Sequence, residues 1–316
     1  MAKEAFEKWK PSPDTVDRLH QIVVVLAEYK TMGIKLTLRQ LYYQLVSKDL
    51  IPNEQKEYKN LGSVLARARL AGLVDWDVIE DRVRRPDKAS DWDDIQGLVK
   101  SAIAAYRLPR WKDQENYVEL WCEKDALRSV IEPITEDLHV TLMVNRGYSS
   151  ISAMYESSKR IRRAMADGKR PTILYLGDFD PSGEDMVRDI RKRMNLLRAD
   201  GLTRVDSNND EGSCPEFVDE DNEALELRVE KIALTSAQIK QHKPPRNPAK
   251  VTDSRYQGFA DAHGTSSYEV DALPPQVLMG IVRRSIEELM DMDLYLSWIK
   301  KEGVEKKRLV LAAKKI

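Results

Sequence analysis

The sequence contains too few cysteines and histidines for a disulfide-stabilised or zinc-dependent protein. Its two cysteines, Cys122 and Cys214, form neither a CxxC pair nor a disulfide framework. Its four histidines lie far apart and form no HExxH motif. A zinc enzyme is therefore disfavoured, and the scarcity of cysteine favours a reducing, cytoplasmic compartment.

Long apolar runs are absent as well. The longest run near the N-terminus covers residues 22–27, far short of the roughly 18 to 20 residues that a membrane span needs. The first ten residues, MAKEAFEKWK, lack the apolar core of a signal peptide. There is also no GxxxxGK[ST] loop. Membrane, secreted and P-loop nucleotide-binding classes are therefore disfavoured.

The charge of the chain is unevenly distributed. The 316 residues carry a net charge of −1, but residues 206–230 hold ten acidic groups and one basic group. Without that stretch, 50 basic and 42 acidic groups remain, a balance of +8. A mildly basic body is compatible with nucleic-acid binding, and the acidic insert near residues 206–226 has the composition of a loop.

The first third of the chain predicts a helical domain. Helical spacing of apolar residues covers about 14–32, 38–48 and 54–72, with Thr37 as the expected N-cap of the middle helix. Residues 72–87 are short, aromatic and basic at their end, as a β-wing is. This order predicts an N-terminal winged-helix domain, CAP-like in type, over residues 1–110.

The rest of the chain, residues 111–316, predicts an α/β domain with a parallel sheet. Short apolar runs at 117–122, 140–144 and 172–177 alternate with helical patterns at 125–138, 150–166 and 182–197. A strand-like segment follows the acidic insert, and a helical tail is expected over 275–301. The predicted fold class is therefore α/β, with an α+β N-terminal part.

Acidic residues follow two of the predicted strands. Glu123 follows the first strand, and Asp178 and Asp180 follow the third. Because sites form at the carboxyl ends of parallel strands, these carboxylates could hold Mg²⁺. The alternatives are structural: Asp180 as the cap of the helix that Pro181 begins, and Glu123 as a solvated turn residue. Asp271 is expected to cap a later helix, although its segment could bring a further acid to the sheet.

A tyrosine is the other candidate. Tyr42 belongs to the apolar stripe of the helix at 38–48, whereas Tyr43 falls about 100° further round, off the stripe. Arg39 lies one turn before Tyr43. A guanidinium there would favour the phenolate and could also bind a phosphate.

The strings RQLYY, EKDA and DFDPSG, in this order, resemble the A subunit of topoisomerase VI and the related meiotic double-strand-break transesterase. The chain is similar to the compact Mini-A members from bacteria, archaea and mobile elements. The resemblance implies a Toprim domain with Glu123, Asp178 and Asp180 as ligands of Mg²⁺, or of Mn²⁺ in its place. The family often has DPDPYG, so DFDPSG keeps both acids but loses an aromatic residue.

The resemblance also implies a reaction. Tyr43 would attack a DNA phosphodiester and form a 5′-phosphotyrosyl link, with Arg39 holding the phosphate and Lys124 adding positive charge beside the metal. It further implies a homodimer in which each tyrosine faces the acids of the partner, and a separate ATPase subunit for strand passage. Double-stranded DNA would be bound through phosphate contacts. The candidates for these contacts are Arg67, Arg69, Arg82, Arg84 and Arg85, and less strongly the basic clusters at 159–163 and 191–193.

Two other functions fit the same residues. One is a Toprim nuclease in which Mg²⁺ activates water and no covalent intermediate forms. The other is a non-catalytic DNA-binding protein in which the acids are structural. Tyr43→Phe separates the transesterase from the nuclease, since only transesterification needs the phenol.

Overall fold

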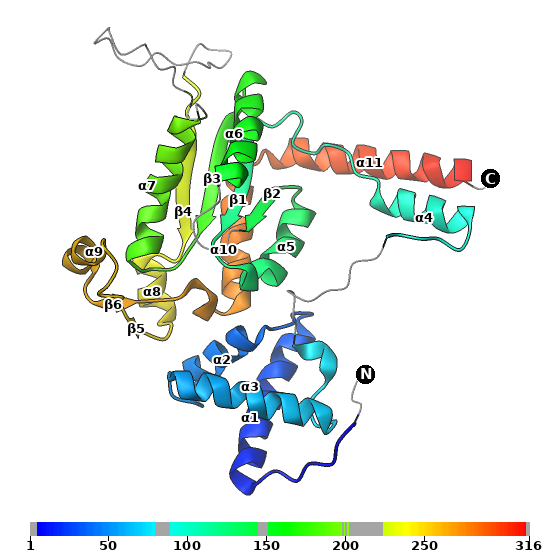
Figure 1. Cartoon of the computed structure of the whole chain (residues 1–316). Coiled ribbons are helices and arrows are strands. Elements are labelled where there is room, and N and C mark those ends of the chain that lie inside the picture. Colours follow the sequence, from blue (N-terminus) through cyan, green and yellow to red (C-terminus); the bar gives the residue numbers. More distant parts are fainter. Residues whose placement is uncertain are drawn as a thin grey trace.

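The computed structural model of the chain describes residues 5–79, 89–144, 151–197, 199, 201 and 224–313. A helical part formed by residues 5–79 lies against one end of a larger part built on a parallel sheet (Figure 1). Within the described residues, no helix combines the length and apolar character that crossing a membrane requires.

The N-terminal part is built from three helices, α1 (Pro13–Thr31), α2 (Leu38–Ser47) and α3 (Gln55–Leu70). Thr37 begins α2 with a capping box: its hydroxyl accepts the backbone N–H of Gln40, and the Gln40 side chain accepts the N–H of Thr37. The apolar faces of the three helices form one buried cluster. The predicted helices and the predicted cap are therefore confirmed.

The segment predicted as a wing is only partly described. It begins with a turn and the short helix η1 (Trp76–Val78), after which Ile79 forms a parallel bridge with Leu36. Residues 80–88 lie outside the described part of the chain, and with them the predicted DNA contacts Arg82, Arg84 and Arg85.

The larger part contains a four-stranded, fully parallel sheet, which confirms the predicted α/β class. Its strands run in the order β2-β1-β3-β4. The bounds are β1 (Asn116–Cys122), β2 (Thr141–Val144), β3 (Arg170–Leu176) and β4 (Arg228–Ala233). The chain passes from β1 outward to β2 and then back across β1 to β3, so the strand order reverses between β1 and β3.

Helices cover both faces of this sheet (Figure 1). One face packs against α5 (Arg128–Asp137), which follows the short helix η2 (Asp125–Leu127), and against α10 (Pro275–Glu287). The other face packs against α6 (Ile151–Ala166) and α7 (Pro181–Leu196). The two apolar layers are typical of a parallel sheet that is buried on both sides.

One buried carboxylate interrupts the apolar pattern of the sheet. Glu119, in the middle of β1, has no exposed surface. It accepts hydrogen bonds from Tyr117 Oη at 2.7 Å, from Trp121 Nε1 at 2.8 Å and from Arg160 Nε at 2.8 Å. Since buried charges persist where they are paired and hydrogen-bonded, Arg160 of the basic cluster at 159–163 has a structural partner.

The C-terminal region differs from the single helical tail predicted over 275–301. It contains α10 and a long second helix, α11 (Met292–Ala313), which packs against α4 (Ile95–Ala105). Between β4 and α10 lie α8 (Ser236–His242), β5 (Asn247–Pro248), α9 (Tyr256–His263), β6 (Ser266–Ser267) and the short helix η3 (Val270–Ala272). Most of the acidic insert, residues 202–223, lies outside the described part of the chain.

Candidate functional site

The ends of β1 and β3 bring Glu123 and Asp178 together. Cys122 pairs with Leu176 at the end of the two strands, so the loops that follow begin side by side. The Glu123 carboxylate accepts hydrogen bonds from Tyr175 Oη at 3.0 Å and from the Asp178 backbone N–H at 3.4 Å. Two of the three predicted metal ligands therefore lie at the point where the strand order reverses.

Asp180 has a different partner. Its Oδ1 accepts the backbone N–H of Gly183 at 2.7 Å, so Asp180 is the N-cap of α7, and Pro181 is the first residue of that helix. Gly183 is required here, because a Cβ at this position would overlap the carbonyl oxygen of Asp178. The structure thus gives Asp180 the capping role that the sequence left open, and its role as a metal ligand stays a prediction.

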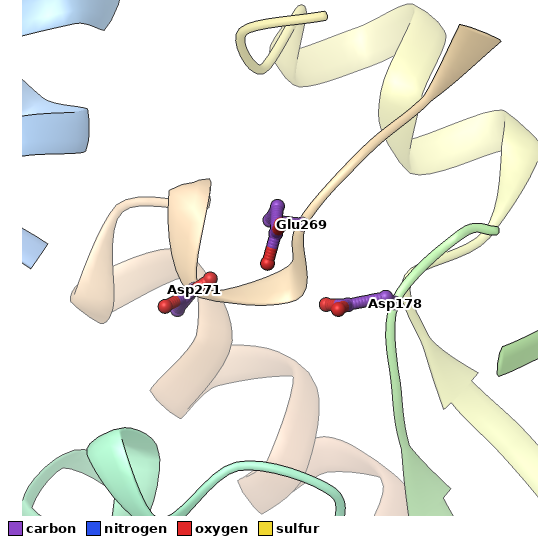
Figure 2. Close-up of side chains that lie close together, drawn as sticks. All are labelled: Asp178, Glu269 and Asp271. Carbon is purple, nitrogen blue, oxygen red and sulfur yellow. The ribbon is translucent and has the colours of Figure 1, made fainter. Parts of the chain in front are cut away.

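The carboxylates that converge are those of Asp178, Glu269 and Asp271 (Figure 2). Oxygen atoms from these three side chains lie within 4.8 Å of one another, and no other group of His, Cys, Asp or Glu in the described residues meets that criterion. Asp178 comes from the loop after β3, whereas the other two flank Val270 at η3. The Val270 backbone N–H donates to Asp178 Oδ1 at 2.8 Å and joins the two segments.

Lys124 lies among these three carboxylates. Its Nζ is 2.7 Å from Asp178 Oδ1 and 2.9 Å from Asp271 Oδ1, and it also pairs with Glu269. Burial works against the ammonium, but the carboxylates outweigh it and raise the pKa of Lys124 above its ordinary value. The lysine predicted to lie beside a metal therefore occupies the centre of the acidic cluster.

Arg39 connects the cluster to Tyr43. Its guanidinium contacts Glu269 Oε2 at 2.6 Å and Asp271 Oδ2 at 3.1 Å, and it donates to Tyr43 Oη at 3.4 Å. The same guanidinium lies 5.6 Å from the centre of the Tyr43 ring. Because α2 packs against η3, the candidate nucleophile and the acidic cluster of one chain belong to a single network of contacts.

The expectation that Tyr43 lies off the packed face of its helix is wrong, because the side chain is only 6% exposed. The reason is that α2 is covered on two sides, by the other N-terminal helices and by η3. Burial, and next Glu269, raise the pKa of the phenol to about 12, although Arg39 acts in the opposite direction. The neighbouring guanidinium therefore does not suffice to make Tyr43 a phenolate at neutral pH.

The cluster has the charge and the donor atoms for a hard cation. When Asp178 is ionised, three carboxylates face two cationic side chains, which leaves one net negative charge, and Glu123 lies beside them. Asp271 Oδ2 is buried and accepts no hydrogen bond, although Arg39 is in ion-pair contact with it. Burial and the neighbouring carboxylates outweigh Lys124 and raise the pKa of Asp178 to about 7. The three carboxylates could hold a metal ion, and Lys124 contacts the same side chains.

The predicted DNA contacts on α3 are engaged within the chain. The guanidinium of Arg67 lies 4.8 Å from the centre of the Trp9 ring. The guanidinium of Arg69 lies 4.4 Å from the centre of the Trp76 ring and donates to the Trp76 carbonyl at 3.0 Å. Cation–π stacking leaves the positive charge in place, so both residues remain predicted phosphate contacts.

The sequence assigned Asp271 to helix capping, and this assignment is wrong. No side-chain cap is formed at η3 or at α10, because the Asp271 carboxylate is turned toward Lys124 and Arg39. The sequence gives Glu269 no role of its own, but the expectation that this segment could bring a further acid to the sheet is confirmed. The signal that could have found both is the acid-x-acid string EVD, which has the same spacing as the DFD string after β3.

No protein-family model, curated protein or solved structure matches this chain.

Proposed function

We propose that this protein cleaves DNA by tyrosine transesterification with the help of a divalent cation, using a winged-helix domain and a Toprim domain. The observation that carries the proposal is the Arg39 guanidinium, which contacts both Tyr43 Oη and the carboxylates of Glu269 and Asp271. A phenol, a phosphate-binding cation and a metal-binding group of acids are thus adjacent, at the carboxyl end of a parallel sheet.

In this reaction the Tyr43 oxygen forms a bond to phosphorus, and the bond from phosphorus to the 3′-oxygen breaks. The products are a 5′-phosphotyrosyl link and a free 3′-hydroxyl, whose proton balances the one lost by the phenol. Arg39 would bind the non-bridging phosphate oxygens and stabilise the negative charge that develops on them. The 3.4 Å contact between the Arg39 guanidinium and Tyr43 Oη supports this positioning role.

Asp178, Glu269 and Asp271 are the residues that would hold the cation, with Glu123 beside them. A divalent cation bound there would neutralise charge on the phosphate and on the leaving oxygen. Lys124 contacts the same oxygens, so the ammonium must give up some of these contacts when the cation binds. Asp178 is common to this ligand set and to the one implied by the family resemblance, and Glu123 of the latter set lies beside it.

The described arrangement is best understood as the DNA-free one. Tyr43 and Asp271 are buried, so a duplex can reach them only if the N-terminal helices move away from the sheet. The contact surface is rich in polar side chains: besides Arg39, Asn53 Nδ2 donates to the Arg246 carbonyl at 3.1 Å and to Asn247 Oδ1 at 2.9 Å. Polar contacts between domains of one chain are of the kind that open and close.

The remaining parts of the proposal concern partners. DNA would be bound through its phosphates, with Arg67 and Arg69 among the contacts, and a homodimer would cut both strands. A separate ATPase subunit would be needed for strand passage.

A covalent-adduct assay tests the proposal. Purified protein is incubated with supercoiled plasmid and Mg²⁺ or Mn²⁺, quenched with detergent, and divided into protease-treated and untreated halves. We expect protein-linked 5′ ends in the wild type and none in Tyr43→Phe. Tyr42→Phe is the matched control, because Tyr42 Oη bonds Asn53 and the Glu54 carbonyl rather than Arg39.

The burial of Tyr43 gives weight to one alternative, a metal-dependent nuclease in which water attacks the phosphate. In that case cleavage leaves free 5′ ends and survives Tyr43→Phe, but is lost in Asp178→Asn. Cleavage that survives both substitutions would rule out both functions for this site.

A further inference from the structure

Two side chains outside the acidic cluster contact the loops that follow β1 and β3. They are Tyr175 in β3 and Lys231 in β4, which lie in register in the parallel pairing of these strands. Residues in register point to the same face of a sheet, and Tyr175 packs on the face that α6 and α7 cover. The pairing shifts by one residue directly after this point, as it does where a bulge re-aims the side chains of a strand.

Tyr175 holds the group that accepts the backbone N–H of Asp178. The Tyr175 side chain is buried, and its Oη donates to Glu123 Oε2 at 3.0 Å. The same oxygen of Glu123 accepts the Asp178 N–H at 3.4 Å. The hydroxyl of Tyr175 therefore fixes the position of the Glu123 carboxylate, and through it the N–H of Asp178.

Lys231 holds the other side of the same residue. Its Nζ donates to the backbone carbonyl of Asp178 at 2.6 Å and to Glu184 Oε1 at 2.6 Å. The ammonium also lies 5.8 Å from the centre of the Phe179 ring. A lysine side chain is flexible, so the ion pair with Glu184 in α7 and the contact with the ring keep the ammonium at the Asp178 carbonyl.

Two glycines provide the space that these contacts need. A Cβ at Gly177 would lie 2.4 Å from Tyr175 Oη, and a Cβ at Gly183 would lie 2.1 Å from the Asp178 carbonyl oxygen that accepts Lys231 Nζ. Neither glycine has a positive φ, so the backbone conformation does not require glycine at either position. The two glycines are required because the Tyr175 hydroxyl and the Asp178 carbonyl occupy the places of their side chains.

We propose that Tyr175 and Lys231 are positioning residues that direct the Asp178 carboxylate into the cation site. Together they hold the N–H and the carbonyl of Asp178, so its backbone is fixed on both sides. The Asp178 side chain then meets the Val270 N–H, which donates to its Oδ1 at 2.8 Å. This inference rests on the cation site of the proposed function and adds the two residues that support it from behind.

The binding of Mn²⁺ to the full-length chain, without DNA, tests the inference. The bound fraction is obtained from the electron paramagnetic resonance signal of the free ion. Groups that orient metal ligands typically change metal affinity by about 10–100-fold, so we expect at least about tenfold weaker binding in Tyr175→Phe and in Lys231→Met. Lys231→Arg keeps a cationic donor at this position and should bind Mn²⁺ more tightly than Lys231→Met.

The chain offers a matched control for each substitution. Tyr117 Oη also donates to a glutamate, Glu119 Oε1 at 2.7 Å, but this carboxylate lies in the middle of β1 and not at the acidic cluster. Lys169 Nζ also donates to backbone carbonyls, those of residues 111, 112 and 114. Tyr117→Phe and Lys169→Met should therefore bind Mn²⁺ like the wild type, whatever stability they lose.

Amide hydrogen exchange provides a second measurement that needs no cation. Tyr175→Phe should speed the exchange of the Asp178 N–H, whose acceptor loses its own donor. Lys231→Met should speed the exchange of the Val270 N–H, because the carboxylate that accepts it is no longer held in place. We expect about tenfold faster exchange at these two amides, with little change at Leu120 in β1. Tyr175→Phe removes a single oxygen atom, so this variant is expected to fold; circular dichroism checks both variants.

Three outcomes would overturn the inference. The first is an unchanged Mn²⁺ affinity in both variants, and the second is an equal loss of affinity in the two controls, which would reflect a general loss of structure. The third is unchanged exchange at Asp178 and Val270. A wild-type chain that binds no Mn²⁺ would instead show that the cation site of the proposed function is wrong, and the exchange rates alone would then decide whether Tyr175 and Lys231 position Asp178.

Discussion

Replacing Lys124 with methionine should destabilise the protein, and a divalent cation should restore the stability. In the structure one ammonium faces three carboxylates, at 2.7 Å from Asp178 and 2.9 Å from Asp271, with Glu269 closing the group. Removing one partner of a buried ion pair typically costs about 3–5 kcal/mol. The Lys124 side chain is 15% exposed, so we expect a loss near the lower end, about 3 kcal/mol, measured by urea unfolding in the presence of a chelator.

A divalent cation is expected to bind Lys124→Met because this variant leaves three carboxylates with only Arg39 to balance their charge. A ligand at one hundred times its dissociation constant adds about 2.7 kcal/mol to the free energy of unfolding. Excess Mg²⁺ or Mn²⁺ should therefore return most of the lost stability, and should stabilise Lys124→Met more than the wild type, in which the ammonium competes for the oxygens.

Lys169→Met provides the control. Lys169 Nζ also has three partners, but they are the backbone carbonyls of Trp111, Lys112 and Gln114. Its loss should destabilise the chain without any recovery in divalent cation. An equal recovery in both variants, or none in Lys124→Met, would refute the idea that these carboxylates form a cation site.

Three further predictions address other features. The ultraviolet titration difference between wild type and Tyr43→Phe should show a phenol that ionises near pH 12 rather than 10, because burial and Glu269 disfavour the phenolate; a midpoint near 10 would refute this reasoning. Glu302 is buried, yet its contacts with Lys306, Leu108 and Arg110 outweigh burial and lower its pKa to about 2. Its stabilising contribution is present above the unfolded pKa near 4.3 and is lost as the pH falls toward 2, so Glu302→Gln should flatten the acid limb of a stability–pH curve. A disulfide between Asn53→Cys and Asn247→Cys should hold the N-terminal helices against the sheet and abolish DNA cleavage until it is reduced; cleavage by the oxidised form would disprove the need for opening.

Much of the fold could be predicted from local patterns. Helical spacing and the Thr37 cap defined the N-terminal helices, and three short apolar runs separated by helices defined a parallel sheet, because both signals are local. Glu119 is an exception to these local patterns. It lies in an apolar run of β1, and a glutamate is expected to be exposed to solvent. Its burial depends on Arg160, 41 residues away, and a single sequence does not show which distant residue will pair with it.

The candidate site could be predicted only in part for the same reason. Glu123 and Asp178 follow strands, so the parallel sheet itself brings them together. Glu269 and Asp271 reach the same place only because the chain, after some 90 further residues, returns past the end of β3 through η3. Asp180 shows the converse, because its position after a strand suggests a metal ligand. Its carboxylate instead accepts the backbone N–H of Gly183 in the first turn of the helix that Pro181 begins.

The link that Arg39 forms between Tyr43 and the acidic cluster of the same chain constrains how a dimer could act on DNA. The family resemblance implies that each tyrosine faces the acids of the partner, whereas here Arg39 joins Tyr43 to Glu269 and Asp271 of the same chain. Tyr43 could face the acids of the partner only after this link opens. The exchanged arrangement costs little free energy, because the same side chains can form the same bonds between subunits. The charges indicate what would favour opening. A carboxylate that turns to bind a cation loses its contact with Arg39 or Lys124. The Arg39 guanidinium released in this way is free to bind a phosphate. By thermodynamic linkage, a DNA phosphate that engages Arg39 must in turn strengthen cation binding at the carboxylates, so cation affinity should rise when DNA is bound and should lose that dependence in Arg39→Gln.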